Sequence, residues 1–133
     1  MSDSTPTPAA DGTTAGGPAP DQVPDFDALT RDIADVPAVE VITTVAVHLM
    51  SAAAVNLGLA EGGEQHKDLD EARKLIHALA GLVDAGSTEI SAFHAAPLRD
   101  GLTSLQLAFR EASDVPDAPG EGPGEKYTGA VPR

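Results

Sequence analysis

The chain has 133 residues, and eight Lys and Arg against 21 Asp and Glu give it a net charge of −13; it contains no Cys. It therefore lacks the clustered basic residues that binding to a nucleic-acid backbone requires, and has neither a disulfide framework nor thiolate chemistry. A chain of this length forms one small domain, and its cysteine usage fits a reducing interior, so we expect a cytoplasmic protein.

Both ends of the chain are predicted to be disordered. Residues 1–24 are acidic and rich in Ser, Thr, Pro, Ala and Gly, and residues 116–133 are rich in Gly and Pro. Such segments bury too little apolar surface to offset the loss of chain entropy on folding. We therefore expect the folded domain within residues 25–115, its core within 39–112, and the tails to be free for contacts with an unknown protein partner.

The first predicted element is a short amphipathic helix in residues 25–34. Phe26, Leu29 and Ile33 recur there at spacings of three and four, which places them on one helix face. Pro37 then interrupts the helix, because the residue before a proline is pushed out of helical geometry. Pro37 is itself expected to be the first residue of the next helix.

The next element is an apolar helix in residues 38–57. It overlaps the stretch VITTVAVHLMSAAAVNLGLA, residues 41–60, which holds no charged side chain. A helix that is apolar around most of its circumference is buried on several sides. One narrow polar stripe interrupts the pattern, formed by Glu40, Thr44, His48 and Ser51.

The same stretch approaches the length and apolarity of a membrane span. Polar residues inside it and acidic flanks without a Lys or Arg cluster argue against insertion. A secretory signal is also not expected, because the stretch begins too far along the chain and no basic region precedes it. Because a three-helix monomer covers only part of the circumference of this helix, we predict that the protein self-associates through residues 38–57.

A second long helix follows a polar turn. Asp68 and Glu71 resemble a capping box at its start, and residues 84–87 contain the signals that end it. Asp70 and Lys74 stand at the spacing of a favourable ion pair. Between the ends, apolar residues recur at spacings of three and four: Leu69, Ala72, Ile76, Leu79 and Val83.

A third helix shows the same periodicity, with Leu98, Leu102, Leu105, Phe109 and Ala112 on one face. Proline is tolerated in the first turn of a helix, so Pro97 predicts a start near Ala95. The fold class is therefore all-α: a helical hairpin plus a third helix form a small bundle, preceded by a short helix and expected to be oligomeric.

Three sequence blocks carry a family resemblance: AVNLGLA, then DLDEARKLIHALAGL, then PLRDGLTSLQLAFREA. This order resembles a small bacterial family of all-helical proteins that is catalogued as a domain of unknown function. The family pattern begins with an apolar helix that ends in Leu-Gly. A helix with the motif Leu-x-x-Ala-x-x-x-Ile follows, and Leu69, Ala72 and Ile76 match it here. The last helix ends near an Arg, which corresponds to Arg110. The resemblance covers about residues 39–112, departs at Pro97 and in the long tails, and implies no activity.

The sequence assigns no catalytic, cofactor-binding or metal-binding residue. His48, His77 and His94 fall one in each helical region, and three converging histidines could bind zinc. No pair of histidines has the spacing of a zinc motif, and neither a nucleophile elbow nor a phosphate-binding glycine loop is present. The favoured prediction is a non-enzymatic interaction or scaffolding module. The alternative is a small-molecule- or metal-binding protein or enzyme with a site between the helices.

Overall fold

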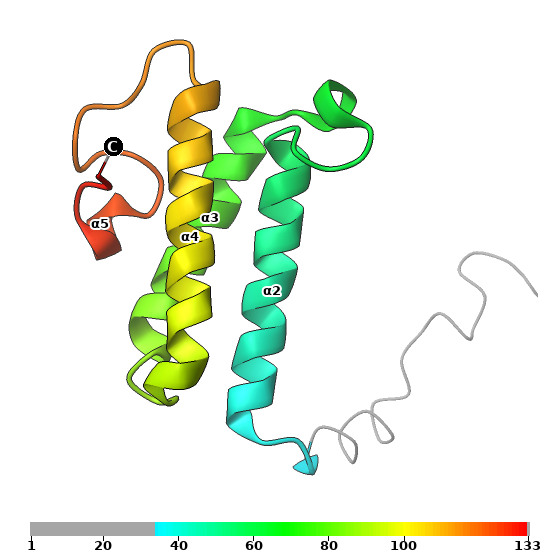
Figure 1. The fold of residues 1–133 in the computed structure, drawn as a ribbon, viewed down its shortest axis with the longest axis vertical. Coiled ribbons are helices and arrows are strands. Elements are labelled where there is room, and N and C mark those ends of the chain that lie inside the picture. The colour runs from blue at the N-terminus through cyan, green and yellow to red at the C-terminus, as the bar shows by residue number, and fades with distance from the viewer. Residues whose placement is uncertain (1–33, 133) are drawn as a thin grey trace, which may run out of the picture. The chain divides into compact units, whose positions relative to one another are not determined.

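The computed structural model describes residues 34–132, and from Pro37 onward they form one compact unit. Its elements are α2 (Ala38–Asn56), the 3-10 helix η3 (Gly63–His66), α3 (Leu69–Gly86), α4 (Ala92–Ala112) and α5 (Glu125–Thr128). α2 and α4 run in one direction and α3 runs in the other (Figure 1). The prediction of an all-α three-helix bundle is therefore confirmed.

Two predicted segments lie outside the described part of the chain. They are the tail of residues 1–24 and, apart from its last residue, the short helix of residues 25–34.

α2 ends at Asn56, one residue before the predicted end. Gly58 adopts a φ of +80°, and the N–H groups of Gly58 and Leu59 donate to the carbonyl oxygens of Val55 and Ala54, each at 3.0 Å. This pair of hydrogen bonds is a Schellman motif, which satisfies carbonyl groups that the helix end leaves free. At the other end Pro37 precedes the helix, and its ψ of 148° is extended, so the prediction that it is the first helical residue is wrong by one position.

α3 begins at the predicted side-chain cap. The Asp68 Oδ1 atom accepts a hydrogen bond from the Glu71 N–H at 3.2 Å, which satisfies one of the free donors of the first turn. The predicted pair of Asp70 and Lys74 is wrong, because the Lys74 ammonium contacts the Glu71 carboxylate instead, at 2.7 Å. Residues three apart on a helix are neighbours as well as those four apart, and the longer Glu side chain reaches the ammonium.

α4 begins at Ala92, three residues before the predicted start near Ala95. The reason is a second side-chain cap, in which Ser91 Oγ accepts from the His94 N–H at 3.4 Å. Pro97 then lies inside the helix, just beyond the first turn. There it removes one backbone hydrogen bond, and the helix continues through it to Ala112.

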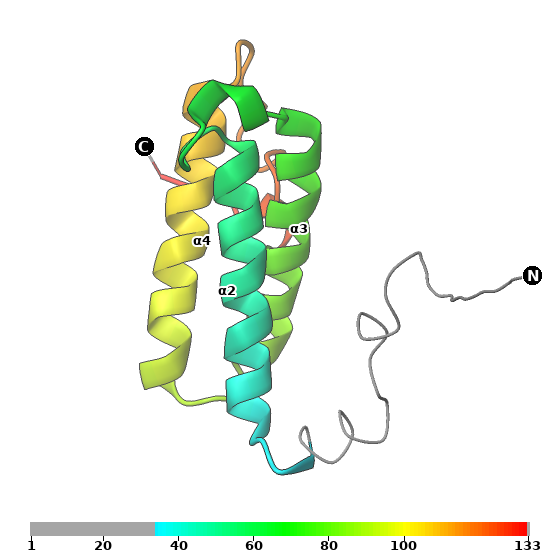
Figure 2. The ribbon, with the colours of Figure 1, turned by 90° about the vertical axis from the view of Figure 1, so that its right-hand side faces the viewer.

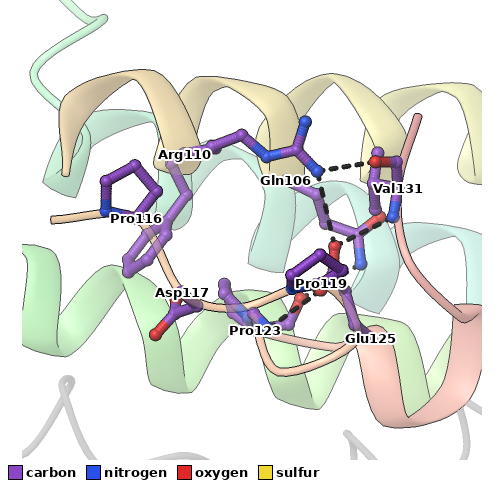
Figure 3. A pocket seen from close by; sticks show the side chains of 10 residues that line it. Gln106, Arg110, Pro116, Asp117, Pro119, Pro123, Glu125 and Val131 are labelled. Carbon is purple, nitrogen blue, oxygen red and sulfur yellow. Dashed lines mark hydrogen bonds and ion pairs between the residues drawn. The ribbon is translucent and has the colours of Figure 1, made fainter. Parts of the chain in front are cut away.

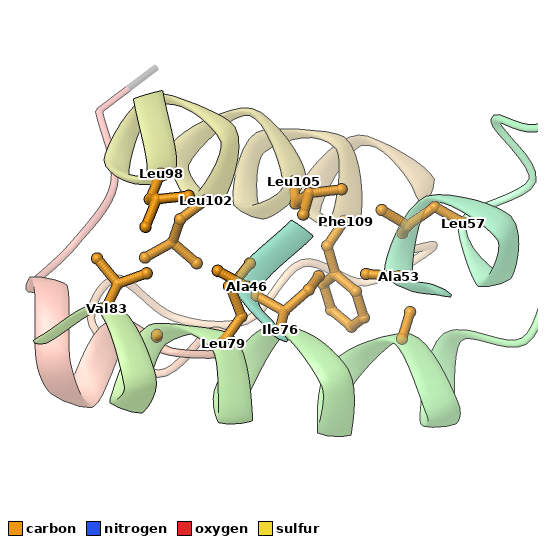
Figure 4. Close-up of a cluster of buried hydrophobic side chains, with 12 residues drawn as sticks. Ala46, Ala53, Leu57, Ile76, Leu79, Val83, Leu98, Leu102, Leu105 and Phe109 are labelled. Atoms are coloured by element: carbon orange, nitrogen blue, oxygen red, sulfur yellow. The ribbon is translucent and has the colours of Figure 1, made fainter. Parts of the chain in front are cut away.

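The core is one cluster of aliphatic side chains with a single Phe (Figure 4). Ile76 and Leu79 on α3 are its largest fully buried members. Apart from Ala112, the apolar residues that periodicity selects on α3 and α4 belong to it or pack against it. Its buried members are Ala46, Ala53, Leu57, Ala72, Ile76, Leu79, Ala80, Val83, Leu98, Leu102, Leu105 and Phe109.

Residues 116–132, which we name the C-terminal strap, fold back onto the bundle. α5 packs against α3, and the strap lies on the side of the α3–α4 pair away from α2 (Figures 1 and 2). Pro123, Gly124, Glu125 and Val131 are buried there. The prediction of a disordered tail is therefore wrong for these residues, because polar contacts from α3 and α4 replace the apolar burial that the strap lacks.

A pair of Leu→Ala variants tests the assignment of the core. Leu79 has no exposed surface, whereas Leu59 after α2 is 62% exposed. We expect Leu79→Ala to lower the free energy of unfolding by about 2–5 kcal/mol through lost burial and a cavity, and Leu59→Ala to change it by about 0.5 kcal/mol or less. Urea denaturation followed by circular dichroism measures both, and equal losses would contradict the packing described.

Candidate interaction surfaces

α2 packs with one side only. Ala46 and Ala53 on that side have no exposed surface, while the opposite side faces solvent. We name this opposite side the outer face of α2, and it consists of Glu40, Val41, Thr44, His48, Ser51 and Val55, all exposed. Among the described residues α2 is the one helix long and apolar enough to cross a membrane by length and composition alone, and only 11% of that stretch is buried.

The outer face combines the predicted polar stripe with exposed valines. Val41 and Val55 are 39% and 37% exposed, and Val45 and Val47 at the two edges are 45% and 47% exposed. Glu40, at one end, is its only charged residue. Large apolar side chains gathered on one exposed face mark an interaction surface more often than scattered ones do.

The residues along the centre of this face are spaced as in a coiled-coil seam. Positions 41, 44, 48, 51 and 55 follow one another at three, four, three and four residues, which is the spacing that keeps a stripe facing a partner helix. α2 therefore has an inner side used by the bundle and an outer seam that no described residue covers.

The structure does not bring the three candidate histidines together. His48 lies on the outer face of α2 and His77 lies beside the ring of Tyr127, with 5.3 Å between the ring centroids. His94 contacts Ser91 Oγ through Nδ1 at 2.8 Å. Within residues 34–132 no three His, Asp or Glu side chains gather as metal ligands. A small-molecule or metal site between the helices stays a prediction.

A second surface lies where the strap meets α3 and α4, and its centre is the carboxylate of Glu125. One carboxylate oxygen accepts from the Gly122 N–H and the other from the Val131 N–H, both at 2.9 Å. The Arg110 guanidinium stands 3.8 Å from the same carboxylate (Figure 3). Glu125 is only 8% exposed, so a single buried acid closes the strap into a loop.

Side chains of α4 hold the main chain of the strap. Gln106 Nε2 donates to the Pro123 carbonyl oxygen at 3.0 Å and to Thr128 Oγ1 at 3.2 Å. Arg110 donates to the Val131 carbonyl oxygen at 2.6 Å. Gln106 is 4% exposed, and its Oε1 atom is buried without a hydrogen-bond partner.

Small residues on α3 form a notch that receives the strap. A Cβ added to Gly124, whose φ is +78°, would lie 2.7 Å from the Cβ of Ala80, so glycine alone fits there. The Tyr127 ring approaches to 3.4 Å from the position of a Cβ on Gly81. The notch therefore accepts a bare backbone and an aromatic ring side by side.

The start of the strap is tied by a more exposed ion pair. The Arg73 guanidinium donates to both carboxylate oxygens of Asp117, at 3.1 and 3.0 Å, and also lies over the Phe109 ring at 4.9 Å from its centroid. A cavity of about 170 Å³ remains between α4 and the strap, bordered by Gln106 and Glu125 among others. The strap thus covers the α3–α4 face without filling it.

The electrostatic balance at Glu125 favours the ionised acid. Burial alone would raise its pKa, but hydrogen bonds from the backbone N–H groups of Val131, Gly122 and Gly120, together with the Arg110 guanidinium, lower the pKa below its ordinary value of 4.5. Hydrogen bonding to the charged form outweighs desolvation here.

These observations define a small helical bundle with two surfaces, a helix face that no described residue covers and a face covered by its own strap. Residues 38–111 match the model of the family described as a domain of unknown function (DUF1844), and the chain belongs to this family. The match confirms the resemblance read from the sequence and ends before the strap begins. No curated protein and no solved structure matches the chain.

Acid should release the strap, and Glu125 should be the group responsible. Because its pKa is lower in the folded state, the ionised form stabilises the strap above pH 4.5, and this contribution is lost as the pH falls through the folded pKa. Tyr127 is the only Tyr and the chain has no Trp, so intrinsic fluorescence follows the strap alone.

We expect Glu125→Gln to flatten the change in Tyr127 fluorescence as the pH falls below 4.5, the ordinary value below which the Glu125 pKa lies. Glu121→Gln is the matched control, because Glu121 is exposed on the same segment and should leave the transition unchanged. An unaltered acid transition in Glu125→Gln would show that another group holds the strap.

Proposed function

We propose that this protein is a non-enzymatic helical module that self-associates through the outer face of α2. The observation that carries the proposal is the mismatch between the apolar composition of α2 and its burial, since only 11% of the residues in the apolar stretch are buried within the described chain. Exposed apolar surface of this kind is unfavourable in water and favours a partner that covers it.

The pattern of the outer face favours a second copy of the same chain as that partner. Positions 41 and 55, both Val, lie at equal distances from His48, and Thr44 and Ala52 form the next such pair. If two α2 helices pack antiparallel about a two-fold axis at His48, Val41 of one copy meets Val55 of the other. Such an interface is self-complementary, as a closed symmetric dimer requires.

The distribution of charge supports the same arrangement. A chain of net charge −13 repels its own copies, so a face for self-association must be nearly free of acids. The outer face has one, Glu40, at its N-terminal end, and antiparallel packing places the two Glu40 side chains at opposite ends of the contact. Association through this face therefore avoids the like charges carried elsewhere.

The size of the contact sets its strength. A helix of 19 residues is about 28 Å long, and one pair of such helices forms an interface at the small end of the range for proteins. We therefore expect a reversible dimer whose population depends on protein concentration.

Charge substitutions on the outer face test both the dimer and its direction. Val41→Glu and Val55→Lys, made separately, should each dissociate the protein, because each would place an unpaired charge against a valine of the other copy. The double variant V41E/V55K should restore association, since the two new side chains of opposite charge would meet across the antiparallel contact. Sedimentation equilibrium at micromolar concentrations measures the mass of each variant.

Ser104→Glu serves as the matched control, because Ser104 is exposed on α4 and adds the same charge away from α2; it should leave the mass unchanged. A monomeric wild-type protein across the concentration range would overturn the proposal. In that case, cosedimentation of the monomer with lipid vesicles would assign the outer face to a membrane surface instead.

A further inference from the structure

We propose that the α3–α4 face under the strap is a peptide-binding groove and that the strap is its resident occupant. The partner that the groove fits is an acidic segment of another protein that forms a short helical turn, with a glycine and a glutamate in sequence and an aromatic residue two positions further on. In this chain Gly124, Glu125 and Tyr127 have that arrangement.

The strap contributes little to the core of the bundle. Neither the buried core cluster nor the partly buried side chains packed against it include any residue after Phe109, and Val131 is the one strap residue among the buried hydrophobic side chains of the described chain. The family match likewise ends at residue 111. A segment that contributes so little to the core can leave the face while the three helices stay folded, which is the first requirement for a displaceable occupant.

The face recognises main chain rather than a particular side chain at most positions. Gln106 and Arg110 direct their N–H groups at the carbonyl oxygens of Pro123 and Val131, which lie on either side of the short helix α5 and belong to the main chain. The notch at Ala80 and Gly81 requires a residue without a Cβ and accepts an aromatic ring beside it. These contacts therefore select the backbone conformation of the bound segment and a glycine with an aromatic residue close behind it.

The charge of the face selects an acidic segment. Arg73 and Arg110 are held by strap carboxylates, Asp117 at 3.0 Å and Glu125 at 3.8 Å. Each guanidinium would lose its carboxylate when the strap leaves, so a competing segment must supply acids at a similar separation. Guanidinium–carboxylate pairing has a defined geometry that a neutral or basic segment cannot reproduce.

The strap occupies the groove incompletely, which leaves room for a competitor. The cavity of about 170 Å³ between α4 and the strap is open space within the contact. Residues 114–121, which lead into the buried part, are exposed. A partner segment with larger side chains over this cavity would gain contacts that the strap does not make.

The test uses the full chain and a fluorescent peptide of residues 116–132 as the probe. Gly124→Ala should loosen the resident strap, since its Cβ would lie 2.7 Å from the Cβ of Ala80. Gly120→Ala is the matched control, because Gly120 also has a positive φ, +85°, but a Cβ there meets nothing within 4 Å. Fluorescence anisotropy measures peptide binding, and circular dichroism measures the helix content.

We expect the Gly124→Ala chain to bind the peptide about tenfold or more tightly than the wild-type and Gly120→Ala chains, because the occupied fraction of the groove lowers apparent affinity. Peptides carrying Glu125→Gln or Tyr127→Ala should bind more weakly, as should a G124A/R110A chain. Val55→Glu, on the outer face of α2, should leave peptide binding unchanged and so separates this result from self-association.

Three results would overturn the proposal. The first is no saturable peptide binding by a folded Gly124→Ala chain. The second is loss of the long helices in that chain, because the strap would then be part of the fold. The third is a higher sedimentation mass when Gly124→Ala is added to the Val55→Glu chain, which would make the strap of a second copy the occupant.

Discussion

The close fit of α2 against the other two long helices is the constraint on which the rest of the structure depends. The buried side of α2 carries Ala46 and Ala53, which let the helix axes approach. Its larger inward side chains meet glycines: Ile42 lies 3.3 Å from a Cβ position on Gly86, and Met50 lies over Gly101. Small residues opposite large ones allow three helices to pack closely with few aromatic side chains.

The small residues on the inner side of α2 have a consequence for its opposite side. Alanines take up part of the inner side beside Ile42, Leu49 and Met50, while the valines at 41, 45, 47 and 55 are exposed on the other side. The sequence therefore carries two stripes on one helix, one for the bundle and one for a neighbour. The strap is placed on the far side of α3 and α4 (Figure 2), so the two surfaces do not compete for the same helix.

Periodicity was sufficient to predict the helices and most of the core. Leu69 to Val83 and Leu98 to Phe109 repeat at helical spacing because their burial is what stabilises the bundle, and the structure buries most of them. The start of α4 was harder to predict. Pro97 indicated a start near Ala95, but the Ser91 cap places the start at Ala92. A cap and a proline six residues apart give opposing signals, and the cap determines where the helix begins.

The strap could not be predicted from its own composition. Its Gly and Pro content indicates a chain with little to bury, and that inference holds for its side chains, of which Val131 and Tyr127 are the main apolar members. What orders it are polar groups far away in sequence, such as Gln106 and Arg110 on α4. No local pattern on α4 distinguishes a glutamine that holds a remote carbonyl from one that faces water.

Gln106 also fixes the order of donor and acceptor between α4 and the strap. Pro123 has no N–H, so it can offer Gln106 only its carbonyl oxygen, and Nε2 donates to that oxygen. The same nitrogen donates to Thr128 Oγ1, so one amide group joins the residues at the two ends of the α5 turn to α4. A side chain with a single N–H or O–H donor could hold only one of these two points.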